Sequence, residues 1–349
     1  MFILLSITMK KKIILSIIAI LILAAGFVAW KFFGPAISVN TKSFLFIRTG
    51  ASSDDVQNEL TKNNFLKGTA WFNMASKIIG YKNIKPGRYK LQQGMSLVSL
   101  IRILRNGQQT PVNFVITKLR TKENLANKIG ALFECDSLQA IAFLNNNDSL
   151  EAYGLDSNTV MAAAMPFTYT IRWNTTPRKI FQQFHTAYKN FWTAERKQKA
   201  DNLGLTPIQV STLASIIEEE TNSKTDKPNI ASVYLNRIAK GIPLQADPTL
   251  KFAMKNFALR RIYYKHLQTV SPYNTYINTG LPPGPICTPA LETIDAVLDS
   301  PKTNYLYFVA SSAFDGTHIF TTNYADHMKY ARLYQQQLNK MESIKKENK

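Results

Sequence analysis

The sequence predicts an α+β protein with three parts: an N-terminal transmembrane helix, a small α+β module and a larger α+β domain. The first observation is an apolar run without charged residues between Ile13 and Trp30. The second is a length of 349 residues with 45% hydrophobic residues, which is enough for two domains with substantial cores. The third is the succession of short apolar strands and amphipathic helices, which is typical of small sheets covered by helices.

The composition excludes several classes of protein. Lys and Arg number 42 against 23 Asp and Glu, so the net charge is +19, although charged residues make up only 19% of the chain. This balance fits a nucleic acid, an anionic membrane or a polyanionic polymer as partner, and it equally fits a solvated basic surface. Cys135 and Cys287 are too few for a disulfide scaffold, a four-cysteine zinc site or an iron–sulfur cluster. The sequence leaves open whether they pair.

Residues 13–33 are predicted to cross a membrane. The run from Ile13 to Trp30 would span ~27 Å as a helix, close to the ~30 Å of a hydrocarbon core. Three lysines precede it, which by the positive-inside rule places residues 1–12 in the cytoplasm and the rest of the chain outside it. A cleaved signal peptide is the alternative, but no small-residue cleavage site follows the run. Export argues against a nucleic-acid partner and favours lipid headgroups or an anionic wall polymer.

Residues 40–116 are predicted to form a small α+β module after a polar linker at 36–43. Short apolar segments predict strands at 44–48 and 112–116, and the segment 84–91 is predicted to be a turn followed by a strand. Capping residues followed by apolar stripes predict its helices, which start at Ser52 or Ser53, extend over 69–80, and follow Ser96. The order of these elements is that of a strand–helix–helix–strand unit.

The larger domain, residues 117–349, is predicted to be mostly helical, with two strands towards its C-terminal end. Its helical segments are separated by polar or Gly/Pro-rich loops. They are expected over 117–160 with a loop at 145–148, over 177–203 as one long segment, from Thr206 to Thr221, from Pro228 to Gly241, and beyond Lys340. The strands are expected at 305–309 and 318–320.

Three consecutive glutamates close the helix that Thr206 and Gln209 begin with a predicted capping box. At ~100° per residue, Glu219 lies opposite the apolar stripe of this helix and is expected to face water. Glu218 lies at the border of the stripe, and Glu220 returns towards it from the other side. Partial burial favours the protonated form of a carboxyl group, which makes Glu218 a candidate general acid. From this pattern alone, a cluster of surface charges is the commoner explanation.

Two later loops carry residue types that bind sugars. Gln245 and Asp247 lie on a predicted loop after the second helix, and Tyr273, Asn274 and Tyr276 precede a rigid Gly/Pro segment at 280–286. Aromatic faces suit pyranose rings, while amides and carboxylates suit hydroxyl groups. The loops therefore indicate a carbohydrate ligand.

With these motifs the sequence resembles the YceG-like family of endolytic murein transglycosylases. The resemblance covers nearly the whole chain and rests on several motifs in a fixed order. These are GRYKLQQGMSLVSLI (87–101), LASIIEEET (213–221), IASVYLNRI (230–238), LQADPT (244–249), YNTY (273–276), GLPPGPI (280–286), YLYFVA (305–310) and His318 with Phe320. The resemblance implies a LysM-like module within 40–116 and a catalytic domain over 117–349.

The implied activity is that of a lytic transglycosylase, a lyase that cleaves the bond between MurNAc and GlcNAc inside nascent peptidoglycan strands and so ends their elongation. A 1,6-anhydroMurNAc end results, and no metal or cofactor is implied. The resemblance implies that Glu218, the first glutamate of the E-x-E-T pattern, is the catalytic acid and base. It implies a supporting role for Glu220, structural or orienting, and for His318, as a hydrogen-bond partner of substrate or of Glu218.

The other implied site residues contact the glycan. They are Asn236, Gln245, Asp247, Tyr273, Asn274 and Tyr276. Each has a structural alternative, as a loop-bracing polar group, a turn residue or a core aromatic. The segment 166–169 (PFTY) departs from the P-[DN]-T-Y pattern of the family, which leaves its role open.

The resemblance also implies a location and partners. The chain would be a single-pass protein of the inner membrane, with its N-terminus in the cytoplasm and its catalytic domain in the periplasm. Peptidoglycan strands and the membrane are the expected partners, a peptidoglycan synthase is a further candidate, and nucleic acid is not expected. Two alternative functions stay open: a muramidase-type hydrolase, and a non-catalytic peptidoglycan-binding organiser of wall synthesis.

Overall fold

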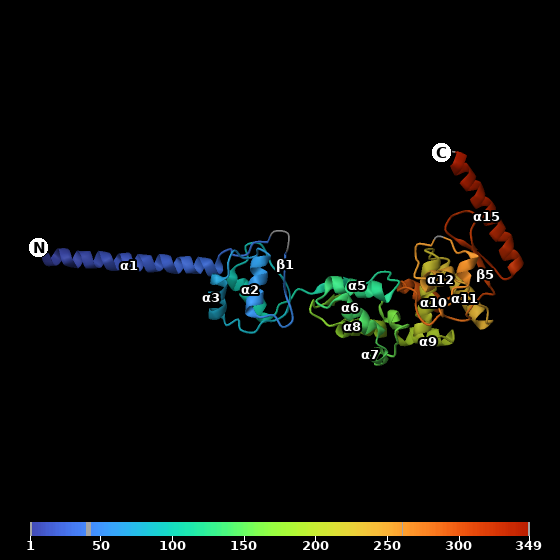
Figure 1. The fold of residues 1–349 in the computed structure, drawn as a ribbon, viewed down its shortest axis with the longest axis horizontal. Coiled ribbons are helices and arrows are strands. Elements are labelled where there is room, and N and C mark those ends of the chain that lie inside the picture. Colours follow the sequence, from blue (N-terminus) through green and yellow to red (C-terminus); the bar gives the residue numbers. More distant parts are fainter. Residues whose placement is uncertain (1, 40–42, 260, 348–349) are drawn as a thin grey trace. The chain divides into compact units, whose positions relative to one another are not determined.

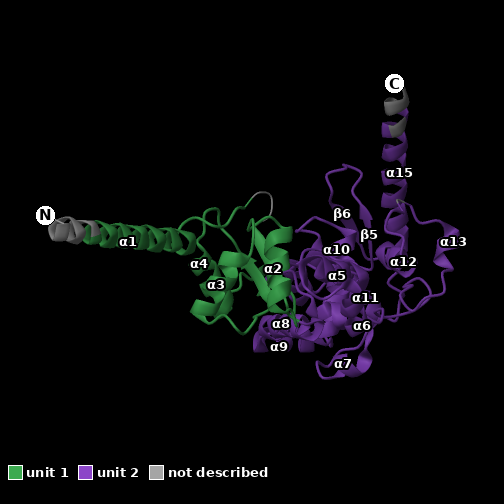
Figure 2. Ribbon diagram, turned by 60° about the vertical axis from the view of Figure 1, so that its left-hand side comes forward, with its two compact units in different colours: residues 1–112, 170–175 green, residues 113–169, 176–349 purple. Residues whose placement is uncertain are grey.

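The structure is a computed structural model that describes residues 2–39, 43–259 and 261–347. It is a mixed α+β protein, mostly helical, and its described strands form small two-stranded sheets. The chain divides into two compact units, one of residues 1–112 and 170–175 and the other of residues 113–169 and 176–349 (Figure 2). The predicted α+β class is confirmed, and the predicted domain boundaries at 40–116 and 117–349 stay predictions.

A long apolar helix, α1 (Phe2–Phe33), begins the chain (Figure 1). Its segment Lys10–Phe33 is long and apolar enough to cross a membrane, and none of that segment is buried in the protein. Exposed apolar side chains along a whole helix are stable in lipid rather than in water. The helix thus fits either a single-pass anchor or a signal sequence.

The rest of the first unit has the predicted order of strands and helices. Strand β1 (Phe44–Ile47) pairs antiparallel with β2 (Gly87–Lys90), with Phe44 opposite Lys90. Three helices, α2 (Ser53–Lys62), α3 (Ala70–Ile79) and α4 (Leu97–Asn106), supply the remaining apolar faces of one core. Ser52 and Ser96 cap α2 and α4 with their hydroxyl groups, as the sequence predicts.

The start of the second unit differs from the prediction in two places. Helix α5 (Lys122–Leu132) is followed by α6 (Ser137–Asn145) and α7 (Asn147–Glu151), so the predicted loop at 145–148 is wrong. The side chain of Asn146 accepts a hydrogen bond from Ser149 N and starts α7 there. The predicted single helix over 177–203 is also wrong. It is divided into α8 (Pro177–Phe191) and α9 (Ala194–Asn202), because Thr193 caps a new helix.

A further two-stranded sheet forms from strands on either side of helices α5, α6 and α7. Strand β3 (Val112–Val115) pairs with β4 (Thr168–Ile171), after the short 3₁₀ helix η1 (Val160–Ala163). Tyr169 of β4 is buried, and its hydroxyl donates to Met165 O at 3.0 Å. The 166–169 segment, whose role the sequence leaves open, therefore contributes a core aromatic residue.

Helix α10 (Pro207–Glu220) lies at the centre of the second unit. The capping box of Thr206 and Gln209 is present, as predicted, and every residue from Val210 to Ile217 is buried. Helices α9, α11 (Lys227–Ala239), α12 (Asp247–Ala253) and α14 (Leu291–Leu298) all contact it. A helix enclosed on all sides has no water-facing side until its last turn.

The C-terminal part closes the unit with a hairpin and a long helix. After the short α13 (Tyr264–Leu267), strand β5 (Tyr307–Ala310) pairs antiparallel with β6 (His318–Thr321), with Ala310 opposite His318. Helix α15 (Tyr324–Glu347) contacts both strands. This register places His318 beside the loop that joins the two strands.

Candidate active site

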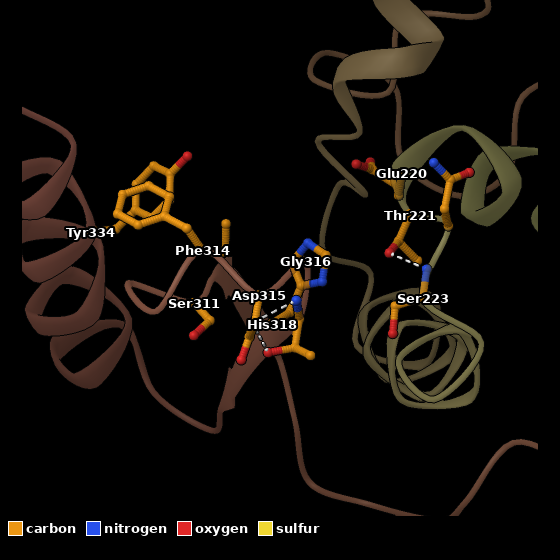
Figure 3. Close-up of a pocket in the computed structure, with 12 residues that line it drawn as sticks. Glu220, Thr221, Ser223, Ser311, Phe314, Asp315, Gly316, His318 and Tyr334 are labelled. Carbon is orange, nitrogen blue, oxygen red and sulfur yellow. Dashed lines mark hydrogen bonds between the residues drawn. The ribbon is translucent and has the colours of Figure 1, made fainter. Parts of the chain in front are cut away.

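An open cavity of about 630 Å³ lies where α10 ends. Figure 3 shows Glu220 and Thr221 on one side of it and Ser311, Phe314, Asp315 and His318 on the other. The first group belongs to the end of α10, and the second to the hairpin of β5 and β6. With Tyr334 of α15, elements far apart in the sequence thus form one polar cavity in the second unit.

Glu220 is the glutamate of the E-E-E run that lines this cavity. The buried Tyr234 of α11 donates a hydrogen bond from its hydroxyl to Glu220 Oε1 at 2.8 Å. Burial raises the pKa of Glu220 to about 7, and the nearby charge of Asp247 acts in the same direction. A carboxyl group whose pKa is raised towards neutral pH is suited to give and take a proton.

Glu218, the predicted catalytic residue, lies in a different environment. Its Oε2 is 2.8 Å from Lys227 Nζ and accepts a further hydrogen bond from the hydroxyl of Thr293. Lys227 also donates to Thr293 Oγ1 at 2.7 Å, so the three groups form a closed set of contacts. The Glu218 and Lys227 side chains are only 15% and 11% exposed. Glu218 is not among the residues that line the cavity at Glu220.

Glu219 does not face water, and that prediction is wrong. Arg120 binds both of its carboxylate oxygens, at 3.0 and 2.9 Å, and Lys118 Nζ is 3.0 Å from Oε1, which leaves the side chain 14% exposed. Burial would raise the pKa of Glu219, but the hydrogen bonds from Arg120 and Lys118 outweigh it and hold the pKa below its usual value. The segment before α5 covers this side of α10, which the helical period alone could not predict.

His318 is held by a residue that the sequence did not single out. Its Nδ1 is 2.9 Å from Asp226 Oδ2, and the two side chains are 15% and 8% exposed. The ring also meets Phe308 edge-on, with 5.5 Å between ring centroids. The structure therefore pairs His318 with Asp226 and not with Glu218, which was one of its two predicted partners beside the substrate.

The predicted glycan residues on α11 and the following loop differ in accessibility. Asn236 donates both hydrogens of its amide to carbonyl oxygens, of Thr303 and Tyr305, each at 2.9 Å. Gln245 is exposed and has a positive φ of 54°. Asp247 is exposed as well, but it begins α12 rather than lying on a loop. Asn236 thus braces the chain near β5, while the side chains of Gln245 and Asp247 are exposed.

The three predicted residues of the Y-N-T-Y motif also differ from one another in their burial and contacts. Asn274 is fully buried, and its amide donates to Leu267 O at 2.9 Å and to Thr269 O at 2.8 Å, which differs from the predicted contact with glycan. Tyr276 donates to Asp247 Oδ1 at 2.5 Å, and burial together with this carboxylate raises its pKa. Tyr273 packs on Phe252 with 4.7 Å between ring centroids. It lines another cavity, of about 330 Å³.

Four residues of the site were missed by the sequence analysis as functional candidates. They are Asp226, Lys227, Tyr234 and Thr293. Tyr234 was expected only as a core residue, although a buried tyrosine hydroxyl needs a hydrogen-bond partner and so signals one. Asp226 and Lys227 resemble any charged pair at a helix start.

The two cysteines, whose pairing the sequence leaves open, are free thiols, and both are buried.

Comparison with known proteins places this chain in a family. The profile of the YceG-like family matches residues 45–333. The endolytic murein transglycosylase of Bacillus subtilis is 31% identical over 304 residues, which cover 82% of this chain and 83% of that protein. The endolytic murein transglycosylase of Streptococcus pneumoniae is 29% identical, and the match covers 83% of this chain but 58% of that protein. The crystal structure of a yceG-like protein from Listeria monocytogenes is similar with a TM-score of 0.55 at 26% identity, covering 82% of this chain and 97% of the other.

Proposed function

Because this chain belongs to the YceG-like family, we propose that it is a membrane-anchored lytic transglycosylase of peptidoglycan. Its substrate would be the MurNAc-β-1,4-GlcNAc bond within nascent strands, and cleavage there would end their elongation. One observation carries the proposal beyond the family name. A glutamate with a pKa of about 7 lines an open polar cavity opposite a histidine. Such a pair of residues is suited to general acid–base catalysis on a sugar.

Two glutamates compete for the catalytic role. The sequence resemblance favours Glu218, whereas the geometry favours Glu220. Glu220 lines the cavity, and its burial keeps a proton available near neutral pH. Glu218 is occupied by Lys227 and Thr293, which would have to release it before it reached a substrate. We therefore assign the acid–base role to Glu220 and a supporting role to Glu218.

The reaction needs a single carboxyl group. Protonated Glu220 gives its proton to the glycosidic oxygen as the bond from that oxygen to C1 of MurNAc breaks. The resulting carboxylate then takes the proton of the C6 hydroxyl, whose oxygen attacks C1. The products are a GlcNAc with a free 4-hydroxyl and a 1,6-anhydroMurNAc end, and Glu220 is protonated again. The attack is intramolecular, so a second carboxylate to activate water is not required.

The remaining parts of the chain complete the proposal. Residues 1–12 would lie in the cytoplasm and residues 13–33 of α1 would anchor the chain in the inner membrane, so that the 117–349 domain acts in the periplasm. The 40–116 segment would be a LysM-like module that binds glycan. Gln245 and Asp247 are the predicted glycan residues that their exposure supports best.

Mass spectrometry of digested wall glycan tests the proposal. Full-length protein in detergent is incubated with purified peptidoglycan, beside Glu220→Gln. We expect wild type to release strands with anhydro ends, which are about 18 Da lighter than reducing ends because no water is added. Reducing ends would show a muramidase-type hydrolase instead. Binding without cleavage would show a wall-binding organiser. Full activity of Glu220→Gln would reject the assignment of Glu220.

A further inference from the structure

Asp226 lies at the N-terminal end of α11 but does not cap the helix, as an aspartate at this position usually does. It occupies the N-cap position, yet its side chain accepts no capping hydrogen bond. The residue is 6% exposed, and its carboxylate turns to Nδ1 of His318 at 2.9 Å. A buried charge that gives up a helix cap for a histidine of a cavity points to a role in that cavity.

The contacts of the neighbouring residue, Lys227, hold Asp226 in position. Lys227 forms an ion pair with Glu218 of α10 and a hydrogen bond with Thr293 of α14. These contacts tie the start of α11 to two other helices, so Asp226 has little freedom to move away from His318. The contacts also give Glu218 a structural task that does not require it to meet substrate.

The pairing decides which nitrogen of His318 faces the cavity. A carboxylate can only accept, so Nδ1 must carry the hydrogen of this contact. In the neutral ring Nε2 is then the unprotonated nitrogen, on the far side of the ring from Asp226. His318 lines the cavity, and Nε2 makes no hydrogen bond to the residues described in the structure. A sugar hydroxyl or acetamido N–H in the cavity would find an acceptor there.

We infer that Asp226 is a positioning residue that holds His318 in the Nδ1–H form, so that Nε2 accepts a hydrogen bond from the glycan beside Glu220. The glycan as ligand rests on the proposed function. The Asp226–His318 contact and the tautomer do not depend on it. An asparagine at position 226 would supply a donor to Nδ1 and so favour the opposite tautomer, with Nε2 as donor.

Imidazole ¹⁵N NMR measures the tautomer directly. The chain has 4 histidines, so the full-length protein in detergent gives few ring signals, and His318→Gln assigns the one of interest. At a pH where the ring is neutral, we expect the Nδ1–H form in wild type and a shift towards the Nε2–H form in Asp226→Asn. Asp295→Asn is the matched control, because Asp295 is paired with Arg196 away from the cavity, and it should retain the wild-type tautomer. An Nε2–H ring in wild type, or no change in Asp226→Asn, overturns the inference.

Glycan cleavage by the same variants tests the consequence. We expect Asp226→Asn and His318→Gln each to reduce the rate about tenfold, the loss of one hydrogen bond to a charged or polarised group. If Asp226 acts through His318, the double variant should be no slower than His318→Gln, whereas a further tenfold loss overturns the inference. If wild type cleaves no glycan while the tautomer still depends on Asp226, the proposed function fails and the placement of His318 by Asp226 stands.

Discussion

The hydroxyl of Tyr234 donates a hydrogen bond to Glu220 at 2.8 Å, and Tyr234 itself is 1% exposed. The bond joins the middle of α11 to the last residue of α10. It stabilises the ionised form of Glu220, while burial of the carboxyl group opposes ionisation more strongly. The pKa of about 7 results from these two opposing effects, burial and the hydrogen bond from Tyr234. Each effect can be changed by mutation.

Tyr234→Phe is expected to raise the pKa of Glu220 further, because it removes a donor to the carboxylate and leaves the burial in place. A general acid is active while protonated, so the rate falls as pH rises through its pKa. The alkaline limb of the pH–rate profile should therefore move up by about one pH unit, the effect of a single hydrogen bond. Cleavage of labelled glycan between pH 5 and 9 measures it. An unmoved limb would show that another group sets this pKa.

Glu220→Gln is expected to stabilise the protein at alkaline pH. The folded pKa of about 7 lies above the usual 4.5, so the folded state binds this proton more tightly than the unfolded state does. Stability from this group is full below the unfolded pKa and is lost as pH rises through 7. Glutamine carries no charge to bury. At pH 8 we therefore expect Glu220→Gln to be about 1–3 kcal/mol more stable than wild type and to melt at a higher temperature, whereas at pH 4 the two proteins should melt at nearly the same temperature.

Glu219→Gln is the matched control for that measurement, with the opposite sign. Arg120 and Lys118 hold the pKa of Glu219 below its usual value, so its contribution to stability is present above the unfolded pKa and is lost as pH falls through the folded one. This variant should therefore melt earlier than wild type at pH 8. If both variants melt later at pH 8, the explanation for Glu219 is contradicted, and if both melt earlier, the explanation for Glu220 is contradicted.

Local signals in the sequence predicted local structure well. The N-cap at Ser52 and the capping box at Thr206 depend on residues three apart, and both form as expected. The helix ends at Gly80 and Gly107 follow from left-handed residues that only glycine adopts easily. These features need no knowledge of the rest of the fold, because their energies come from neighbours in the chain.

Burial and pairing in the site depended on distant residues, and there the sequence was insufficient. The helical period placed Glu219 in water because it assumed one buried face, whereas α10 is enclosed by other helices and by the segment that carries Arg120. Asp226 and His318 are 92 residues apart. Nothing in either local segment specifies that they meet, since a hairpin and a helix start are brought together only by packing.

Glu218→Gln distinguishes the roles of Glu218 and Glu220 when thermal stability and glycan cleavage are both measured. It would leave the buried ammonium group of Lys227 without a charged partner, which costs about 3 kcal/mol of stability. We expect an earlier melting transition, and at temperatures where the variant is folded we expect anhydro products at a reduced rate. Replacing Glu218 and Lys227 together by methionine should restore most of the stability. A Glu218→Gln protein that melts like wild type and cleaves nothing would instead make Glu218 the acid that the sequence predicts.

Asn274→Ala tests whether a predicted glycan residue is structural. The amide of Asn274 is fully buried and donates to the carbonyl oxygens of Leu267 and Thr269, so alanine would leave two partly buried acceptors unsatisfied. Each costs about 1–3 kcal/mol, and we expect a large loss of stability with little change in KM for glycan. Gln245→Ala is the comparison, because the Gln245 side chain is exposed and its loss should act on KM with little effect on melting. A stable Asn274→Ala protein with a raised KM would restore Asn274 as a glycan contact, and would mean that the 267–276 loop opens to bind substrate.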